Sequence, residues 1–122
     1  MKQISFGLLL FFILAVSTGC GNNPYAKGEE IYVSRCASCH MTDGSGLAGN
    51  IPSLKESEVA ANNANLVCVI LKGIKAEPLE MPAQELEAIP LTNLVNYINH
   101  QFKEKTSEVR LDSIKTWIKN CD

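Results

Sequence analysis

The sequence of 122 residues predicts an all-α fold, made of four or five short helices joined by loops with little or no sheet. Residues 91–102 and 111–118 carry apolar side chains at spacings of three and four, which is the pattern of one helix face. Segments rich in Gly, Ser, Asp or Pro separate the apolar runs. No internal repeat and no low-complexity stretch indicates a second domain, so one small helical domain is expected.

The first helix is expected to begin at Pro24 and to run to about residue 36. Asn23 can cap it, and Pro24 suits the first helical position because its missing N–H is not needed there. Residues 42–50 follow, and their Gly, Ser and Asp content predicts a loop.

The middle of the chain predicts two short helices. Ser53 and Glu56 have the spacing of a capping box, which indicates a helix beginning there. Asn62-Asn63 interrupts it, and Gly73 ends the next apolar run. Periodicity alone also allows a strand for that run, but its length and Asn-rich start favour a helix. Its apolar residues are Leu66, Val67, Val69, Ile70 and Leu71.

Three prolines between residues 76 and 90 predict a mostly extended loop. Thr92 can cap the next helix, whose apolar face consists of Leu91, Leu94, Val95, Ile98 and Phe102. Thr106 or Ser107 is expected to open a last helix, with one side formed by Leu111, Ile114, Trp117 and Ile118.

The N-terminus has the form of an export signal: Lys2, an apolar run too short to span a bilayer comfortably, and a small-residue exit. The exit before Cys20 resembles a bacterial lipobox, although Ser17 stands where that pattern usually has an aliphatic residue. We expect a signal peptide over 1–19, a tether over 20–23 and the domain over 24–122. Lipid on Cys20 would then anchor the domain to a membrane, facing the periplasm. The alternatives are an ordinary cleaved signal or an uncleaved anchor, with Cys20 incidental.

Composition limits the partners. The net charge is −2, and no basic run or stripe indicates nucleic acid. We expect a monomer.

The cysteine count predicts one disulfide. Cys20 is expected to carry lipid, and Cys36 and Cys39 belong to the motif described below, which leaves Cys68 and Cys121. In an oxidising compartment these two thiols most simply pair. Such a bond contributes roughly 4 kcal/mol in the chain-entropy model. The alternative is a buried thiol at Cys68 and a frayed one at Cys121.

The motif Cys36-Ala37-Ser38-Cys39-His40 is the Cys-x-x-Cys-His pattern that attaches a c-type haem. Two thiols add to the haem vinyl groups, and His40 then supplies an axial nitrogen to the iron. A dithiol redox pair expects a βαβ pattern nearby, which is absent from the sequence. A structural zinc site needs four ligands, and the remaining Cys and His form no second pair. One covalent haem c is therefore the expected cofactor.

From Tyr25 to Phe102 the chain resembles a class I cytochrome c, which implies a bundle of short helices packed around one covalently attached haem. The resemblance implies a close helix crossing at Gly28, a Pro52 carbonyl that accepts a hydrogen bond from the axial His, and packing of Leu54 on the haem. It also implies that Tyr32, Leu94 and Tyr97 belong to the haem pocket or to the helix crossing. The matching pieces, in the family's order, are Gly28 and Tyr32, Cys36–His40, Gly44-Ser45-Gly46, Pro52 and Leu54, Met81-Pro82, and Leu94, Tyr97 and Ile98.

In that family a Met sulfur from a downstream loop is the second iron ligand. Met1 lies in the signal and Met41 directly follows His40, so Met81 in the proline-rich loop is the expected ligand. The alternatives are His100 and an open or water-bound iron. The chain departs from the family at Met41, where many relatives have Gly, and in its last helix, where Trp117 is expected to pack rather than relay electrons.

His and Met ligation leaves no open iron position, which favours a one-electron carrier over an enzyme. We expect redox partners from a respiratory chain. One alternative is a haem subunit of a periplasmic dehydrogenase, oxidase or reductase complex. Another is a haem sensor or small peroxidase, which requires an open or labile sixth position.

Overall fold

The structure is a computed structural model that describes residues 21–77 and 79–121. The expected signal peptide over 1–19 and the lipidation site at Cys20 lie outside the described residues. Within the described part there are six helices and two isolated β-bridges, but no strand. The helices are α2 (Ala26–Arg35), α3 (Ala37–His40), α4 (Glu58–Ala61), α5 (Asn63–Lys72), α6 (Ala88–Lys103) and α7 (Leu111–Lys119).

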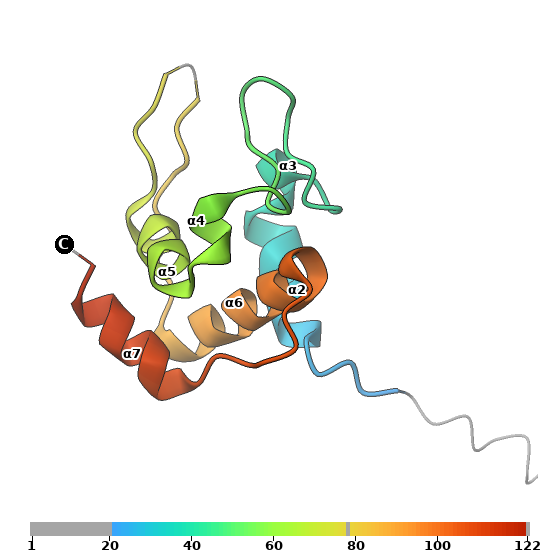
Figure 1. The fold of residues 1–122 in the computed structure, drawn as a ribbon, viewed down its shortest axis with the longest axis vertical. Coiled ribbons are helices and arrows are strands. Elements are labelled where there is room, and N and C mark those ends of the chain that lie inside the picture. The colour runs from blue at the N-terminus through green and yellow to red at the C-terminus, as the bar shows by residue number, and fades with distance from the viewer. Residues whose placement is uncertain (1–20, 78, 122) are drawn as a thin grey trace, which may run out of the picture.

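The helices form one packed unit, with α6 at its centre. It crosses α2 and also contacts α4, α5 and α7. Two long loops, 41–57 and 73–87, rise from the same end of the bundle (Figure 1). No helix in the described ranges has the length and apolarity needed to cross a bilayer.

Gly28 allows α2 and α6 to cross closely. A Cβ atom there would lie 2.1 Å from the Asn93 carbonyl oxygen and 2.6 Å from Cβ of Tyr97. Neither distance is compatible with a side chain, so the crossing requires glycine. The close approach expected from the sequence is therefore present in the fold.

The hydrophobic core gathers around this crossing and between α5, α6 and α7. Ile114 brings α7 into it and is completely buried. The other buried apolar residues are Tyr32, Leu54, Ala60, Leu66, Val67, Ile70, Leu91, Leu94, Val95, Tyr97, Ile98 and Phe102. Burial of such side chains contributes about 25 cal/mol per Å² of apolar surface, so the core is the main source of stability.

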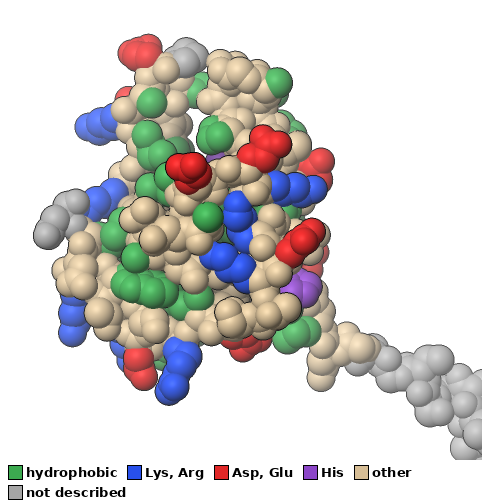
Figure 2. Space-filling view, in the orientation of Figure 1, with side chains coloured by type: hydrophobic (Ala, Val, Ile, Leu, Met, Phe, Trp, Pro, Cys, Tyr) green, Lys and Arg blue, Asp and Glu red, His purple; other side chains and the backbone are tan. Residues whose placement is uncertain are grey.

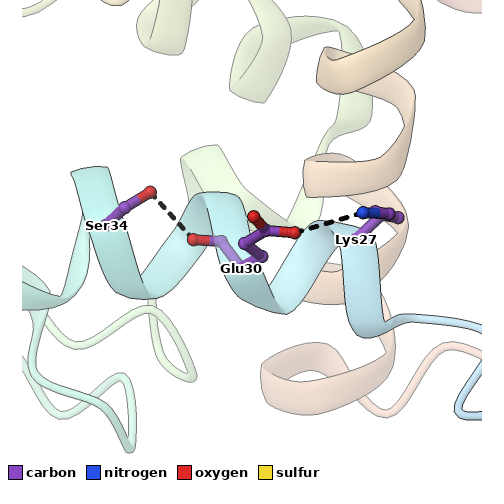
Figure 3. A network of polar contacts seen from close by, with 3 residues as sticks. All are labelled: Lys27, Glu30 and Ser34. Carbon is purple, nitrogen blue, oxygen red and sulfur yellow. Dashed lines mark hydrogen bonds and ion pairs between the residues drawn. The ribbon is translucent and has the colours of Figure 1, made fainter.

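The opposite face of α2 is exposed to solvent. Lys27 Nζ lies 3.4 Å from a Glu30 carboxylate oxygen, and Ser34 Oγ donates to the Glu30 carbonyl at 2.8 Å (Figure 3). The two charged side chains are 80% and 72% exposed. Exposed pairs of this kind contribute little, so this face does not determine the fold.

The N-termini of α2 and α4 differ from the sequence predictions. Asn23 Oδ1 accepts from the Tyr25 N–H in a turn, and α2 begins only at Ala26. Ser57, rather than Ser53, caps α4 by accepting from the Ala60 N–H. Ser53 Oγ instead accepts from Lys55 N. In both cases a short polar side chain satisfies a turn before the helix starts.

The starts of α6 and α7 were also predicted wrongly. α6 begins at Ala88 and includes Pro90, because prolines are tolerated in the first turn, where N–H groups lack partners. Thr92 is inside the helix, and its hydroxyl donates to the Ala88 carbonyl. α7 begins at Leu111 instead of residue 106 or 107. Asn96 bonds both the N–H and the carbonyl of Val109, which holds the connection extended.

Candidate functional site

A cavity of about 220 Å³ lies between the 41–57 and 73–87 loops, and the surface is hollowed there (Figure 2). We call the Cys36–His40 motif with the 41–57 loop one wall and the 73–87 loop, which contains Met81, the other. The remaining lining residues are Arg35, Asn50, Ile51, Pro52, Ile74, Ala76, Leu79, Glu80, Pro82 and Gln84.

The motif lies at the end of α2 and on the short helix α3. The Cys36 N–H bonds the Tyr32 carbonyl at 2.8 Å, and the His40 N–H bonds the Cys36 carbonyl at 2.9 Å. Both thiols are unpaired, Cys36 half-buried and Cys39 exposed. Burial raises the pKa of the Cys36 thiol to about 11, and the nearby Arg35 charge partly opposes this. At neutral pH Cys36 is therefore a protonated thiol rather than a thiolate.

His40 is half-buried, and its Nδ1 atom is buried without a well-formed hydrogen bond. Burial lowers the pKa of His40, while the nearby Pro52 carbonyl acts in the opposite direction. The Pro52 carbonyl is thus close enough to influence the ring, although it falls short of hydrogen-bond geometry. A neutral imidazole on a cavity wall is a good ligand for a metal such as iron.

The turn after His40 is held by several hydrogen bonds. Gly46 N–H donates to the His40 carbonyl at 3.0 Å, and Gly44 N–H donates to the Met41 carbonyl at 3.2 Å. The Tyr32 hydroxyl also donates to the Met41 carbonyl, at 2.6 Å. Burial, with the Cys36 charge next, raises the pKa of Tyr32 well above its usual range, so this hydroxyl stays protonated.

Two lysines attach the rest of this wall to α6 and its C-terminal extension. Lys103 Nζ donates to the carbonyls of Lys55 at 2.6 Å and Ser57 at 3.2 Å. Lys105 Nζ donates to the Ala61 carbonyl at 2.7 Å. These contacts fix the segment that follows Pro52, and so they help to define the wall that faces Met81.

Met81 is positioned by the loop that leaves α5. Gly73 ends α5 with φ +71°, and a Cβ atom there would lie 2.3 Å from the Met81 carbonyl oxygen. Ile74 and Met81 then exchange two backbone hydrogen bonds of 2.9 Å. Gln84 N–H closes the loop by donating to the Ile70 carbonyl at 2.9 Å. Half-buried Met81 therefore lines the cavity from the 73–87 loop, a different segment from the one that carries the motif.

His100, the alternative second ligand, is not among the residues that line the cavity. It is exposed and stacks on Tyr25, with ring centroids 4.2 Å apart. The structure therefore separates His100 from the motif and brings Met81 to it. Trp117 packs half-buried against the core and is also outside the cavity lining.

The other residues singled out from the sequence occupy two kinds of position. Pro52 lines the cavity, whereas Leu54 is buried in the core, where its N–H bonds the Gly44 carbonyl at 2.8 Å. Tyr32, Leu94 and Tyr97 are buried core residues, and Tyr97 lies at the α2–α6 crossing. None of these three is among the residues that line the cavity.

Cys68 and Cys121 form a disulfide, the pairing expected from the cysteine count, with their Cα atoms 5.2 Å apart. It joins α5 to the residue just beyond α7. Because α5 leads directly into the loop that carries Met81, the disulfide braces the helix from which that loop leaves.

Sequence reasoning missed Ile74, Leu79 and Gln84, which also line the cavity. The sequence contains one indication of Ile74, which directly follows Gly73 at the end of α5. In the structure Ile74 pairs with Met81. Ile74 and Leu79 are 43% and 46% exposed, which places apolar surface at the edge of the cavity.

The residues present fit a haem c group. Two free thiols and an imidazole stand on one wall, a thioether stands on the other, and most of the nearby surface is apolar. In residues 21–77 and 79–121 no three His, Cys, Asp or Glu side chains come together as a metal site, so a zinc site lacks its ligand set. A dithiol site lacks its βαβ context in the same ranges, which contain no strand.

Comparison with known proteins agrees with this chemistry. Residues 23–98 match the family described as cytochrome C oxidase, cbb3-type, subunit III. Two relatives are the cytochrome c subunits of quinone alcohol dehydrogenases from Gluconacetobacter polyoxogenes and Komagataeibacter europaeus. Each is 32% identical over 96 residues, which covers 70% of this chain. The chain spans 20% of the length of these relatives.

Proposed function

The chain belongs to the cbb3-type subunit III family of c-type cytochromes, and on that premise we propose that Cys36 and Cys39 attach its haem while His40 and Met81 are the axial ligands. It is a haem c electron-transfer protein rather than an enzyme in its own right. The haem supplies one-electron Fe(II)/Fe(III) chemistry, and the residues around it determine its ligation and access to partners.

The observation that supports these ligands is that both line one cavity, His40 from the Cys36–His40 motif and Met81 from the 73–87 loop. With His40 and Met81 both holding the iron, no open position would remain at the metal for a substrate. A thioether ligand also gives a higher reduction potential than a second imidazole does. The exposed side chains of Ile74 and Leu79 give a redox partner an apolar surface to contact beside the cavity.

The relatives favour a second candidate. Both are named as cytochrome c subunits of quinone alcohol dehydrogenases, which supports a role for this chain as the haem subunit of a periplasmic dehydrogenase, oxidase or reductase complex. A free carrier of the respiratory chain purifies as a monomer from mild detergent. Recovery of one dominant partner at equal stoichiometry would favour the complex.

The proposed location is a membrane surface facing the periplasm, through lipid on Cys20. A supporting feature is that the chain enters α2 at the end remote from the motif, and a helix of ten residues is about 15 Å long. An anchor there directs the cavity away from the bilayer. We expect Cys20→Ser to move the protein from the membrane to the soluble periplasmic fraction. Retention in the membrane would contradict lipid anchoring.

The ligation is tested by absorption spectra of the purified protein in both oxidation states. We expect a low-spin spectrum with the weak long-wavelength band of Met-ligated Fe(III), which disappears in Met81→Ala. His40→Ala should lose the low-spin spectrum altogether. His100→Ala is the control, and its spectrum should match the wild type because His100 is stacked on Tyr25 outside the cavity. A Met81→Ala variant with an unchanged spectrum would overturn the proposed second ligand.

A further inference from the structure

Met41, which directly follows the proposed ligand His40, has an unusual backbone conformation. Its φ is 62° and its ψ is 158°, a region that is adopted almost only by glycine. A side chain on this residue therefore makes the turn less favourable than it would be with glycine. Such a conformation persists only where the surrounding structure holds it in place.

Tyr32 supplies part of that restraint. Its hydroxyl donates to the Met41 carbonyl at 2.6 Å, the shortest hydrogen bond on this turn. The Tyr32 side chain is completely buried, with its ring centroid 5.4 Å from that of Tyr97 and 5.0 Å from that of Phe102. The aromatic cluster thus holds the Tyr32 hydroxyl in place. Movement of the turn away from its present conformation would therefore break the hydrogen bond to the Met41 carbonyl.

The restraint reaches the imidazole through one residue. The Met41 carbonyl is bonded by Tyr32 and Gly44, and the preceding carbonyl of His40 is bonded by Gly46. Relaxation at Met41 therefore changes the backbone directly beside His40. The buried Nδ1 of His40 lies near the Pro52 carbonyl without a well-formed bond, so a small rotation of the ring changes that contact.

We propose that the Tyr32 hydroxyl is a positioning group for the axial imidazole, because it holds the strained Met41 turn that orients His40 toward Pro52. The inference rests on the proposed ligation of iron by His40. A contact between the second ring nitrogen of a ligating His and a carbonyl makes the imidazole a stronger donor. A stronger donor favours Fe(III), so losing this orientation should raise the reduction potential.

The experiment compares Tyr32→Phe with Tyr25→Phe, both measured as the haem-loaded protein by redox titration. Tyr32→Phe keeps the ring and removes only the hydroxyl. We expect its Fe(II)/Fe(III) equilibrium to shift toward Fe(II) by about threefold or more, roughly 30 mV at 59 mV per tenfold. Tyr25→Phe removes a hydroxyl from the same end of the chain but lies against His100, and its potential should be unchanged. If the reduction potentials of Tyr32→Phe and Tyr25→Phe both equal that of the wild type, the proposal is overturned, even if Tyr32→Phe is less stable.

Met41→Gly provides the second arm, because glycine adopts this conformation without strain. In a Met41→Gly background the turn no longer needs the hydroxyl, so adding Tyr32→Phe should shift the potential much less than it does in the wild type. The same shift in both backgrounds would show that the hydroxyl does not act through Met41. If Tyr32→Phe alone fails to mature, recovery of the haem-loaded double variant supports the proposal, and failure of both overturns it.

His40→Ala separates this inference from the function on which it rests. A spectrum that loses its low-spin form in His40→Ala while Tyr32→Phe leaves the potential unchanged would refute the role of Tyr32 alone. An unchanged spectrum in His40→Ala would refute the ligation, and the role of Tyr32 with it.

Discussion

The two walls of the cavity are built differently. The wall that carries His40 is attached to the closest helix crossing, where Gly28 meets Asn93, and its turn is bonded by a buried tyrosine. The wall that carries Met81 is a loop held by the Ile74–Met81 pair and one bond from Gln84 to α5. Its neighbours Leu79, Glu80 and Pro82 are exposed.

This difference indicates how the two proposed ligands behave. The turn directly after His40 is bonded by the completely buried Tyr32, so we expect His40 to separate from the iron only when the domain unfolds. The Met81 side chain also packs against the core, but its backbone is held by local bonds within an exposed loop, and such loops open at lower free energy than the core does. We therefore expect Met81 to be lost first when the protein is destabilised.

The largest expected effect is on the Met81 side. Cys68→Ser/Cys121→Ser removes a bond between residues 53 positions apart, which should lower the free energy of unfolding by about 4 kcal/mol. The loss should show as a lower midpoint in guanidinium, monitored by the Met-dependent absorption band. Wild-type protein whose disulfide has been reduced and alkylated, and whose haem iron has then been reoxidised to Fe(III), is the control and should behave in the same way. A decrease in the free energy of unfolding of less than about 1 kcal/mol would contradict the bracing role of the disulfide.

The next effect is on the His40 side. Gly28→Ala places a Cβ atom against the Asn93 carbonyl, and the helices must separate, at a cost of about 3 kcal/mol. Unlike loosening of the loop, this change should remove the haem spectrum and the helical circular dichroism together. Glu30→Gln, on the exposed face of α2, should change stability by no more than about 0.5 kcal/mol. A Gly28→Ala protein as stable as the wild type would show that α6 can move without cost.

The smallest effect should be confined to the loop. Gly73→Ala introduces a side chain at φ +71° and close to the Met81 carbonyl, at a cost of roughly 1–3 kcal/mol. We expect the Met-dependent band to be lost at a lower denaturant concentration than the helical signal. Gly49→Ala is the matched control, because Gly49 also has a positive φ but its Cβ would contact nothing. If the Met-dependent band and the helical signal of Gly73→Ala disappear at the same denaturant concentration, the two walls unfold as one cooperative unit.

The fold class and the motif were predictable because both depend on local chemistry. The all-α fold is confirmed, and the family match confirms a c-type cytochrome with haem c. The spacing in Cys36–His40 and the position of Met81 in the loop between α5 and α6 follow from the sequence alone. The Gly28 crossing was also expected, and the structure adds the distances that require glycine there.

The helix boundaries were less predictable, because several polar residues compete to cap each start. Ser53 and Ser57 are both suitable caps, and only the tertiary position of Lys103 against the Lys55 and Ser57 carbonyls distinguishes them. Likewise, Asn96 fixes the backbone of Val109 from another helix, which delays α7. The hydrogen bond from Tyr32 to Met41 joins residues nine positions apart through a turn, and periodicity contains no sign of it.

The separate placement of the four cysteines has a consequence for biogenesis. Cys36, Cys39, Cys68 and Cys121 can be fully paired in three ways, and all three would consume the thiols needed for the vinyl groups, so only a single Cys68–Cys121 bond leaves both of them free. In the fold, Cys36 and Cys39 face the cavity, while Cys68 and Cys121 meet where α5 packs against α7. The fold thus pairs the two cysteines that lie away from the cavity and leaves Cys36 and Cys39 as free thiols, the state that haem attachment requires.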